Sequence, residues 1–242
     1  MSEKIRLNKY MARCGLGSRR ECDRLISAGL VTINGSLVDE LGVKVNEEDI
    51  ILFKGKAIEL IKKVEYIAYH KQPGTVVTKI DPENRETIYD AIKTKTGYDA
   101  SLLTYVGRLD MFSEGLLLLT NDGDLIHSLT HPKFHIKKVY KIKLDRAMTP
   151  EDARLLVNDG IEDREQLLKA GAVRIRGGDF CEIDLYEGKN RQIRRMLEAL
   201  DYKILKLIRL QYGAVKLRDL QPGSYRELAE REVKALKSKG YN

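Results

Sequence analysis

The apolar residues at the start of the chain repeat with the period of an α-helix. Four of them follow the spacing i, i+3, i+4 and i+7, and they are Leu7, Tyr10, Met11 and Cys14. This spacing predicts a short helix that ends near Gly15 or Gly17. A second helix should begin at Ser18, where Glu21 completes a capping box, and should end at Gly29, because glycine suits the left-handed position after a helix.

Two short runs of apolar and β-branched residues follow the second helix. They span residues 31–33 and 36–38 and are joined by Asn34-Gly35, a dipeptide typical of two-residue hairpin turns. A further strand is expected at residues 50–53, with an exit turn at residues 54–56. We therefore expect a small domain over residues 1–60, a linker over residues 61–65 and a larger domain over residues 66–242.

The larger domain alternates short apolar runs with turns and with two or three helical stretches. One helix is predicted after Thr149, which provides an N-cap ahead of Pro150, and it should stop at Gly160. Another helix is predicted over residues 191–200, where every third or fourth residue is apolar. The pattern predicts an α+β protein whose second domain is a mixed, largely antiparallel sheet flanked by helices.

Three arginines crowd near the start of the helix predicted over residues 191–200: Arg191, Arg194 and Arg195. Their charges repel one another and oppose the helix dipole. The cost is reasonable if the arginines meet phosphates or a buried carboxylate.

The segment 139–144 alternates between apolar and basic residues, as a strand with one buried face does. Tyr140 falls on the apolar face and is predicted to face the core or a pocket. A core tyrosine whose hydroxyl is hydrogen-bonded is the more common case for such a position.

Composition indicates a globular protein, with 43% hydrophobic residues and 5 prolines among 242 residues. No apolar stretch approaches the roughly 18 residues of a membrane-spanning helix, and the N-terminus does not read as a signal peptide, so we expect a cytoplasmic protein. The three cysteines form no Cys-x-x-Cys pair and are expected to be core thiols: they are Cys14, Cys22 and Cys181.

The formal net charge of +7 permits a polyanionic partner without identifying one. The basic residues are clustered, however, with seven Lys or Arg against three acids in residues 1–24 and again in residues 187–209. A third cluster lies within residues 133–146. Three clusters favour RNA or DNA as a partner.

The segment 107–123 combines a carboxylate with a run of four leucines that reads as a fully buried strand. Asp110 lies just before this strand in a loop that begins with Gly107, so a rigid element can hold its side chain in a fixed pose. Asp110 is therefore a candidate catalytic acid, although a turn cap or a partner of Arg108 would fit the same residues.

Other chemistries are less well supported. His131 and His135 have a metal-like spacing, but no cysteine lies near them and a proline follows His131, so a zinc site is not expected. The chain has no glycine-rich phosphate loop, serine elbow or dinucleotide fingerprint. A two-carboxylate glycosidase using Asp110 and Glu114 is a weaker alternative, because their spacing along the chain does not establish the separation that such chemistry needs.

Four ordered motifs resemble those of the bacterial ribosomal RNA pseudouridine synthases of the RsuA/RluB type. They are His70-Lys71-Gln72-Pro73-Gly74, Gly107-Arg108-Leu109-Asp110, Lys138-Val139-Tyr140 and the segment 188–196. Residues 3–60 are similar to the S-four RNA-binding domain through Arg6-Leu7-Asn8-Lys9, Ser18-Arg19-Arg20 and the Gly29 to Gly35 segment. The pair Met111-Phe112 departs from the polar or charged pair that many relatives carry after the aspartate.

This resemblance implies an enzyme that detaches uracil from its ribose nitrogen bond, turns it and rejoins it through carbon 5, without a cofactor or metal. Asp110 would be the essential carboxylate, Tyr140 would stack on the target base, and Arg194 would pair with Asp110. Substrate contacts would come from Arg108, Leu207, Arg191 and Lys189. RNA contacts of the small domain would come from Lys9, Arg13, Arg19, Arg20 and Asn34.

Physical reasoning supports these roles. An enzyme that acts on a base must extrude it from its stack, and an aromatic platform and phosphate contacts recover part of that cost. A working aspartate must stay ionised where water is excluded, which a guanidinium favours. We expect a monomer that acts on ribosomal RNA or a pre-ribosomal particle, with the large-subunit RNA favoured. A small-subunit enzyme and a non-catalytic RNA-binding assembly factor remain the alternatives.

Overall fold

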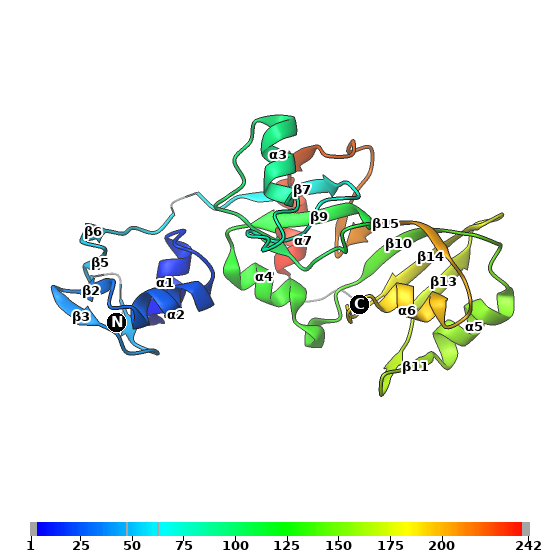
Figure 1. Ribbon diagram of the computed structural model, residues 1–242, viewed down its shortest axis with the longest axis horizontal. Coiled ribbons are helices and arrows are strands. Elements are labelled where there is room, and N and C mark those ends of the chain that lie inside the picture. The colour runs from blue at the N-terminus through cyan, green and yellow to red at the C-terminus, as the bar shows by residue number, and fades with distance from the viewer. Residues whose placement is uncertain (1–3, 47, 62, 239–242) are drawn as a thin grey trace. The chain divides into compact units, whose positions relative to one another are not determined.

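The computed structural model describes residues 4–46, 48–61 and 63–238. The chain divides into two compact units, a first unit over Met1–Val64 and a second unit over Glu65–Asn242 (Figure 1).

The two helices predicted near the N-terminus are present in the first unit. Helix α1 (Leu7–Arg13) packs against α2 (Arg19–Ser27) through the predicted apolar residues. The Ser18 hydroxyl caps α2 by accepting a hydrogen bond from the backbone N–H of Glu21. Gly29 follows α2 with a φ of +67°, the left-handed conformation expected there.

The predicted hairpin of the first unit is also confirmed. Strands β2 (Val31–Ile33) and β3 (Ser36–Val38) pair antiparallel, and β5 (Ile51–Phe53) pairs with the other edge of β2. Asn34 and Gly35 have φ values of +51° and +85°, as a two-residue turn with two positive φ angles requires.

Three short strands of the first unit were not expected from the sequence. Strand β6 (Lys56–Ala57) pairs with β5, so the segment expected to be an exit turn is instead a hairpin. Strands β1 (Ile5–Arg6) and β4 (Lys44–Val45) form a separate two-stranded ladder. Strands of two residues are too short to show an alternation of apolar and polar positions.

The second unit is built on a nine-stranded sheet whose main path is β13-β14-β10-β15-β9-β7-β17, with β8 paired to β9 and β16 to β15. Its strands are β7 (Tyr66–Lys71), β8 (Thr104–Val106), β9 (Glu114–Thr120), β10 (Lys138–Leu144), β13 (Ala172–Ile175), β14 (Phe180–Leu185), β15 (Ile204–Tyr212), β16 (Val215–Lys216) and β17 (Tyr225–Glu227). Strands β11 (Ile161–Asp163) and β12 (Gln166–Leu168) form a separate hairpin. Within this sheet only β9 and β15 pair parallel, so the expected largely antiparallel α+β fold is confirmed.

Helices cover both faces of this sheet. They are α3 (Ile88–Thr96), α4 (Gly123–Thr130), α5 (Pro150–Asn158), α6 (Gln192–Glu198) and α7 (Glu230–Lys237), and a short 3₁₀ turn, η1, spans Pro132–Phe134. Leu117 and Leu119 of β9 belong to a core that includes residues of α3, α5 and α6. Leu116 and Leu118 belong to a second core with residues of α4 and α7. The four leucines are therefore buried on both faces, as the sequence indicated.

Five α-helices in the described part of the second unit exceed the two or three expected. The predicted helices are present as α5, which Thr149 caps, and α6, which is shorter than the expected 191–200 span. Helix α3 was not predicted because its apolar residues are spread among threonines and lysines and its capping box uses Asp90 rather than a glutamate.

Strands β9 and β15 pair parallel at Gly115, which lies opposite Arg209. A Cβ atom added at Gly115 would lie no more than 3.0 Å from three backbone atoms of Arg209. The φ of +111° at Gly115 is also one that residues with a side chain rarely adopt. Glycine thus permits the backbones of these two central strands to touch.

Candidate active site

Asp110 lies in the loop that joins β8 to β9, and its side chain is 35% exposed. The backbone carbonyl of Asp110 accepts a hydrogen bond from the N–H of Ser113 at 3.0 Å, which closes the loop into a turn. The buried Leu109 anchors the loop from the residue before. The carboxylate is therefore carried by a short, closed loop at the start of a fully buried strand, as predicted.

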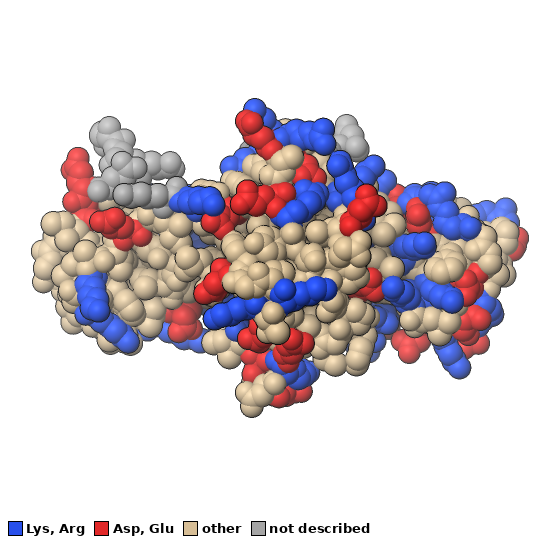
Figure 2. Space-filling model, turned by 90° about the horizontal axis from the view of Figure 1, so that it is seen from above, with Lys and Arg blue, Asp and Glu red and all other residues tan. Residues whose placement is uncertain are grey.

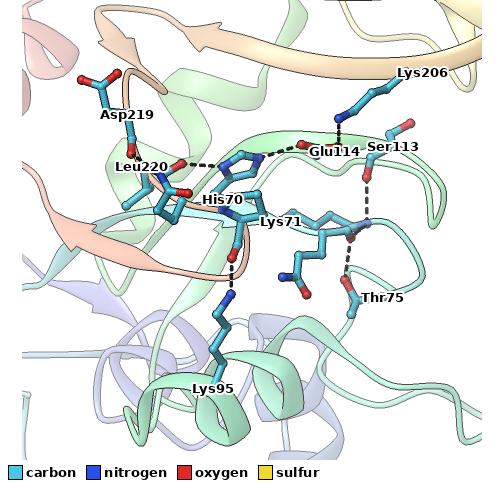
Figure 3. Close-up of polar contacts among 12 residues, drawn as sticks. His70, Lys71, Thr75, Lys95, Ser113, Glu114, Lys206, Asp219 and Leu220 are labelled. Carbon is cyan, nitrogen blue, oxygen red and sulfur yellow. Dashed lines mark hydrogen bonds and ion pairs between the residues drawn. The ribbon is translucent and has the colours of Figure 1, made fainter.

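The side chain of Lys71 holds this loop from inside the protein. Its Nζ donates hydrogen bonds to the carbonyl oxygens of Gln72 at 2.8 Å, Met111 at 3.0 Å and Ser113 at 3.0 Å. The Lys71 side chain is fully buried at the end of β7, and Figure 3 shows its bond to Ser113. Two of the three acceptors flank Phe112 in the loop that carries Asp110, so Lys71 fixes the backbone beside the carboxylate.

Burial lowers the pKa of Lys71 to about 8, and the positive charge of Arg209 contributes in the same direction. The carboxylates of Asp110 and Glu114 oppose this shift. From the sequence we treated Lys71 only as part of a motif, and its role in holding the loop was missed. A lysine at the end of a buried apolar strand, ahead of Gln-Pro-Gly, was the available signal.

His70 and Glu114 form a second polar cluster next to Lys71. The Nδ1 of His70 lies 2.7 Å from the carbonyl oxygen of Leu220, and the Nε2 lies 3.1 Å from Oε1 of Glu114 (Figure 3). Lys206 contacts the other oxygen of Glu114 at 3.0 Å. The two ring nitrogens of His70 thus link the carbonyl of Leu220 to the carboxylate of Glu114.

These contacts weigh against the two-carboxylate alternative. Glu114 is 7% exposed and is occupied by His70 and Lys206. Among the described residues, it lines neither of the two cavities that Asp110 lines. Glu114 thus lies in the wrong place to share a substrate with Asp110.

Arg194 pairs with Asp110, as the sequence predicted. Its Nε donates to Oδ2 of Asp110 at 3.3 Å, and its Nη2 donates to the hydroxyl of Ser113 at 3.2 Å. Nη1 of Arg191 lies 3.8 Å from the same carboxylate oxygen. Arg191 stands just before α6 with a φ of +49°, an uncommon conformation for a residue with a side chain.

Arg195, the third arginine of this cluster, turns away from Asp110 and pairs with Asp163 of β11. The crowding of positive charge at the start of α6 is therefore compensated by two partly exposed carboxylates, whereas the sequence indicated phosphates or a buried carboxylate.

A cavity of about 100 Å³ brings most of the predicted pocket residues together. Asp110, Tyr140 and Leu207 all line it, although β8, β10 and β15 are far apart in the sequence. The remaining predicted residues on its wall are Arg108, Lys189, Arg191 and Arg194. Tyr140 and Leu207 are buried and form apolar parts of the wall, which suits a flat, partly apolar ring.

The basic side chains of the pocket differ in availability. Nζ of Lys189 donates to the carbonyl of Leu167 at 2.7 Å and pairs with Glu187 at 3.1 Å, so protein groups already engage it. Arg108 is exposed, and its carbonyl accepts a hydrogen bond from the buried Arg209.

Two larger grooves adjoin this cavity. One, of about 330 Å³, shares Arg108, Tyr140 and Lys189 with it and also includes Lys138, whose pKa burial lowers to about 8. The other, of about 530 Å³, shares Asp110 and Arg191. Lys and Arg side chains gather over the part of the second unit that carries β10 and α6, interspersed with fewer acids (Figure 2). The surroundings of Asp110 can therefore accept an extended polyanion.

The candidate RNA contacts of the first unit lie on or near its two helices. Arg19 and Arg20 are exposed in the first turn of α2, as predicted, whereas Lys9 and Arg13 are partly buried. The amide of Asn34 accepts from the N–H of Ile50 and donates to Asp49, each at 2.9 Å, so Asn34 has a structural role in the hairpin.

Within residues 4–46, 48–61 and 63–238, no group of three or more His, Cys, Asp or Glu side chains is placed to hold a metal ion. No helix in that part of the chain is long and apolar enough to cross a membrane.

Two family models match the chain. Residues 65–199 match the model described as RNA pseudouridylate synthase, and residues 5–51 match the S4 domain.

Two curated relatives match over nearly their whole length. A Bacillus subtilis protein named ribosomal large subunit pseudouridine synthase B is 35% identical, and the match covers 96% of this chain and 96% of the relative. An Aquifex aeolicus protein named as an RNA pseudouridine synthase is 36% identical, and the match covers 96% of this chain and 93% of the relative. A crystal structure of a pseudouridylate synthase superposes with a TM-score of 0.69 at 30% identity, covering 96% of this chain and 99% of the other.

Proposed function

The chain belongs to the RNA pseudouridylate synthase family, and on that premise we propose that it isomerises a uridine of ribosomal RNA, with the large-subunit RNA favoured and Asp110 as the essential carboxylate. The resemblance seen in the motifs is thereby confirmed at the level of the family, and the protein is a pseudouridine synthase with an RNA-binding S4 domain. The particular RNA and the roles of the pocket residues are the parts that we propose.

The observation that carries this proposal is the convergence on Asp110. One carboxylate lines a small cavity with an aromatic wall at Tyr140, and a guanidinium of Arg194 contacts it. Either version of the chemistry, a nucleophilic aspartate or one that drives glycosidic cleavage, needs an ionised carboxylate beside the sugar of the extruded nucleotide. Arg194 and Arg191 both lie within ion-pair distance of that carboxylate.

Tyr140 would stack on the detached uracil while the ring turns, and Leu207, beside it on the same face of the sheet, would extend the apolar wall. Arg108, exposed at the rim, would occupy the space that the base leaves in the RNA. Arg191 would contact the phosphates beside the target. Lys189 would contribute less to RNA binding, because its Nζ is already hydrogen-bonded to the protein.

The large-subunit RNA is favoured because the Bacillus subtilis relative carries that name over 96% of both chains. We propose that the enzyme acts as a monomer in the cytoplasm, on ribosomal RNA or on a pre-ribosomal particle. The S4 domain would hold structured RNA through the exposed Arg19 and Arg20, with Lys9 and Arg13 nearby on α1.

The test is conversion of uridine in ribosomal RNA by wild-type protein and by the Asp110→Asn variant. The variant should lose conversion while it keeps RNA affinity, because the amide cannot act as a carboxylate. Asp201→Asn is a matched control, since the Asp201 side chain is fully exposed and should leave the rate unchanged. Undiminished conversion by Asp110→Asn would remove Asp110 from the chemistry.

The substrate is tested by mapping pseudouridines in ribosomal RNA from cells with and without this protein. A site lost from large-subunit RNA supports the proposal, whereas a site lost from small-subunit RNA establishes the alternative. Comparing naked RNA with partly assembled particles in vitro then identifies the form on which the enzyme acts.

A further inference from the structure

Ile80 is an apolar side chain held in water at the rim of the groove that contains Asp110. It is 83% exposed, more than any other large apolar side chain in the described part of the chain, and Phe112 follows at 68%. Ile80 lies in the loop between β7 and α3, and it lines the groove of about 530 Å³ that Asp110 and Arg191 also line. The protein thus presents an isoleucine to solvent beside its catalytic carboxylate.

The loop that carries Ile80 is braced on both sides of this residue. The Thr78 hydroxyl donates to the carbonyl of Ile80 at 2.7 Å and accepts from its N–H at 3.3 Å. The carboxylate of Asp81 accepts three hydrogen bonds from Arg85, at 2.9 Å from the backbone N–H, 3.0 Å from Nε and 2.8 Å from Nη2. These bonds lower the pKa of Asp81 to about 2, so the brace persists at every physiological pH.

The base of the loop is fixed as well. The N–H of Val76 donates to the carbonyl of Glu86 at 2.9 Å, and the N–H of Ile88 donates to the carbonyl of Val76 at 3.0 Å. Nζ of Lys79, next to Ile80, donates to the carbonyl of Ser101 at 2.8 Å. The isoleucine is therefore held in place before any partner arrives.

The rest of the groove indicates what covers Ile80. Its basic lining consists of Arg85, Arg108, Lys189 and Arg191, against the acids Asp81 and Asp110. An exposed isoleucine on a rim that also carries Arg108 and Arg191 matches a nucleic acid, whose phosphates meet these two cations while its base faces accept an apolar wedge. Continuity with the cavity of Asp110 places this contact beside the nucleotide that must leave its stack.

We propose that Ile80 is a wedge that inserts between stacked bases next to the target uridine and keeps the opened RNA helix from closing. This inference rests on the proposed function, because it assumes that the groove of Asp110 receives RNA. It adds a residue that selects for structured RNA: the wedge helps where stacking must be broken and has little to do where the strand is already unpaired.

The kinetic test compares Ile80→Ser and Ile80→Leu on two substrates, a uridine within a double-helical stem and the same uridine in an unpaired strand. Ile80→Ser should lose about tenfold or more in kcat/KM on the stem and clearly less on the unpaired strand. Ile80→Leu should retain the rate on the stem, because it keeps the apolar bulk. Leu102→Ser is the matched control, since Leu102 is 54% exposed and lines none of the three cavities around Asp110.

A binding test gives a second readout that does not require turnover. In the Asp110→Asn background, 2-aminopurine placed beside the target in the stem should brighten when the protein unstacks it, and Ile80→Ser should abolish that rise. Equal loss on both substrates, or no loss on the stem, overturns the wedge. An unchanged fluorescence rise in Ile80→Ser also overturns the wedge, and this result can be read whether or not the protein turns over. If the wild-type protein converts neither RNA, that result separately refutes the proposed function.

Discussion

Nε of Arg194 lies 3.3 Å from Oδ2 of Asp110, although 84 positions separate the two residues. The same guanidinium donates to the hydroxyl of Ser113, so it orients the loop as well as the charge. Two functions of one side chain can be separated by substitution, because a lysine retains the charge but cannot make both contacts.

Arg194→Lys should therefore lower kcat by about 100-fold, a reduction typical of a misplaced reacting group, and Arg194→Ala should lower it further. Single-turnover conversion of saturating RNA measures this directly. Arg154→Lys is a suitable control, because Arg154 is exposed and pairs only with neighbouring residues of α5. Full activity in Arg194→Lys would show that charge alone suffices.

Tyr140 lines the cavity of Asp110, and its proposed role is to offer a flat surface there, so its two substitutions should differ. Tyr140→Phe should retain the stacking face and lose only part of the rate, whereas Tyr140→Ala should lose more, through the missing platform. Single-turnover rates on the same RNA compare the three proteins. Equal rates in all three would exclude Tyr140 from the site.

Arg19 and Arg20 are exposed on α2, where they can meet phosphates without other protein contacts being disturbed. Replacing both by alanine should weaken RNA affinity and reduce the salt dependence of binding, by about one unit of slope for each phosphate that is no longer neutralised. Turnover on saturating RNA should be retained. Titrations over a range of salt concentrations provide the measurement, and an unchanged slope would contradict a docking role.

Lys71 should make the loop that carries Asp110 sensitive to alkaline pH. Its pKa of about 8 means that the ammonium, with three N–H donors for three carbonyls, is lost above that pH, and a neutral amine has only two. We expect kcat to decline as the pH rises through about 8. Lys138 also has a pKa of about 8, so the Lys138→Arg variant is the control. If the decline in kcat disappears in this variant, Lys138 rather than Lys71 causes it.

The contribution of Lys71 to the free energy of unfolding should rise with pH, whereas kcat should fall. The unfolded chain keeps the Lys71 proton up to a pKa near 10.5, so between pH 8 and 10.5 the unfolded state binds more protons than the folded state. The contribution of Lys71 to the free energy of unfolding therefore rises with pH over this window. Urea unfolding at pH values on either side of it, compared with Lys71→Met, measures the difference.

Asp184 of β14 is a buried carboxylate that pairs with Arg174 of β13 and with Lys137, the residue before β10. Burial alone would raise the pKa of Asp184, but hydrogen bonds from Arg174 and Lys137 outweigh it and hold the pKa below its usual 3.8. Nη1 of Arg174 lies 3.0 Å from Asp184 and Nζ of Lys137 lies 2.7 Å from it. Asp184→Asn should cost about 3 kcal/mol, toward the low end for a broken buried pair because both cations are partly exposed.

The pH dependence of this stabilisation has a definite sign. The stabilisation by Asp184 is fully present above the unfolded pKa of 3.8 and is lost as the pH falls through the lower folded pKa. The free energies of unfolding of the wild-type protein and Asp184→Asn should therefore converge in strong acid. Asp179→Asn is the control, since its exposed pair with Lys143 at 3.6 Å is worth less than about 1 kcal/mol. Chemical denaturation of the three proteins measures both effects, and equal costs for the two substitutions would contradict the assignment.

The sequence predicted those parts of the fold that local rules determine. The Asn34-Gly35 turn, the Thr149 cap and the alternation through Tyr140 each depend on a few neighbouring residues, and each is present in the structure. Helix α3 and the two-residue strands were not predicted, because their patterns of apolar residues are short or weak. Tertiary contacts stabilise these elements instead.

The sequence predicted the residues of the candidate site but not the buried side chains that hold them in position. Motifs named Asp110, Tyr140 and Arg194, and the expected contact between the first and last is present. No periodicity could show that Lys71 would turn inward to hold three carbonyls, or that His70 would bridge Leu220 and Glu114, because both depend on strands that meet only in the folded sheet.

The close crossing at Gly115 limits how this enzyme can be altered. Alanine there would force β9 away from β15, and these strands continue into the Asp110 loop on one side and the Leu207 wall on the other. A single methyl group at this buried residue would thus widen the pocket. Libraries aimed at new uridine targets should hold position 115 constant and vary the rim of the groove.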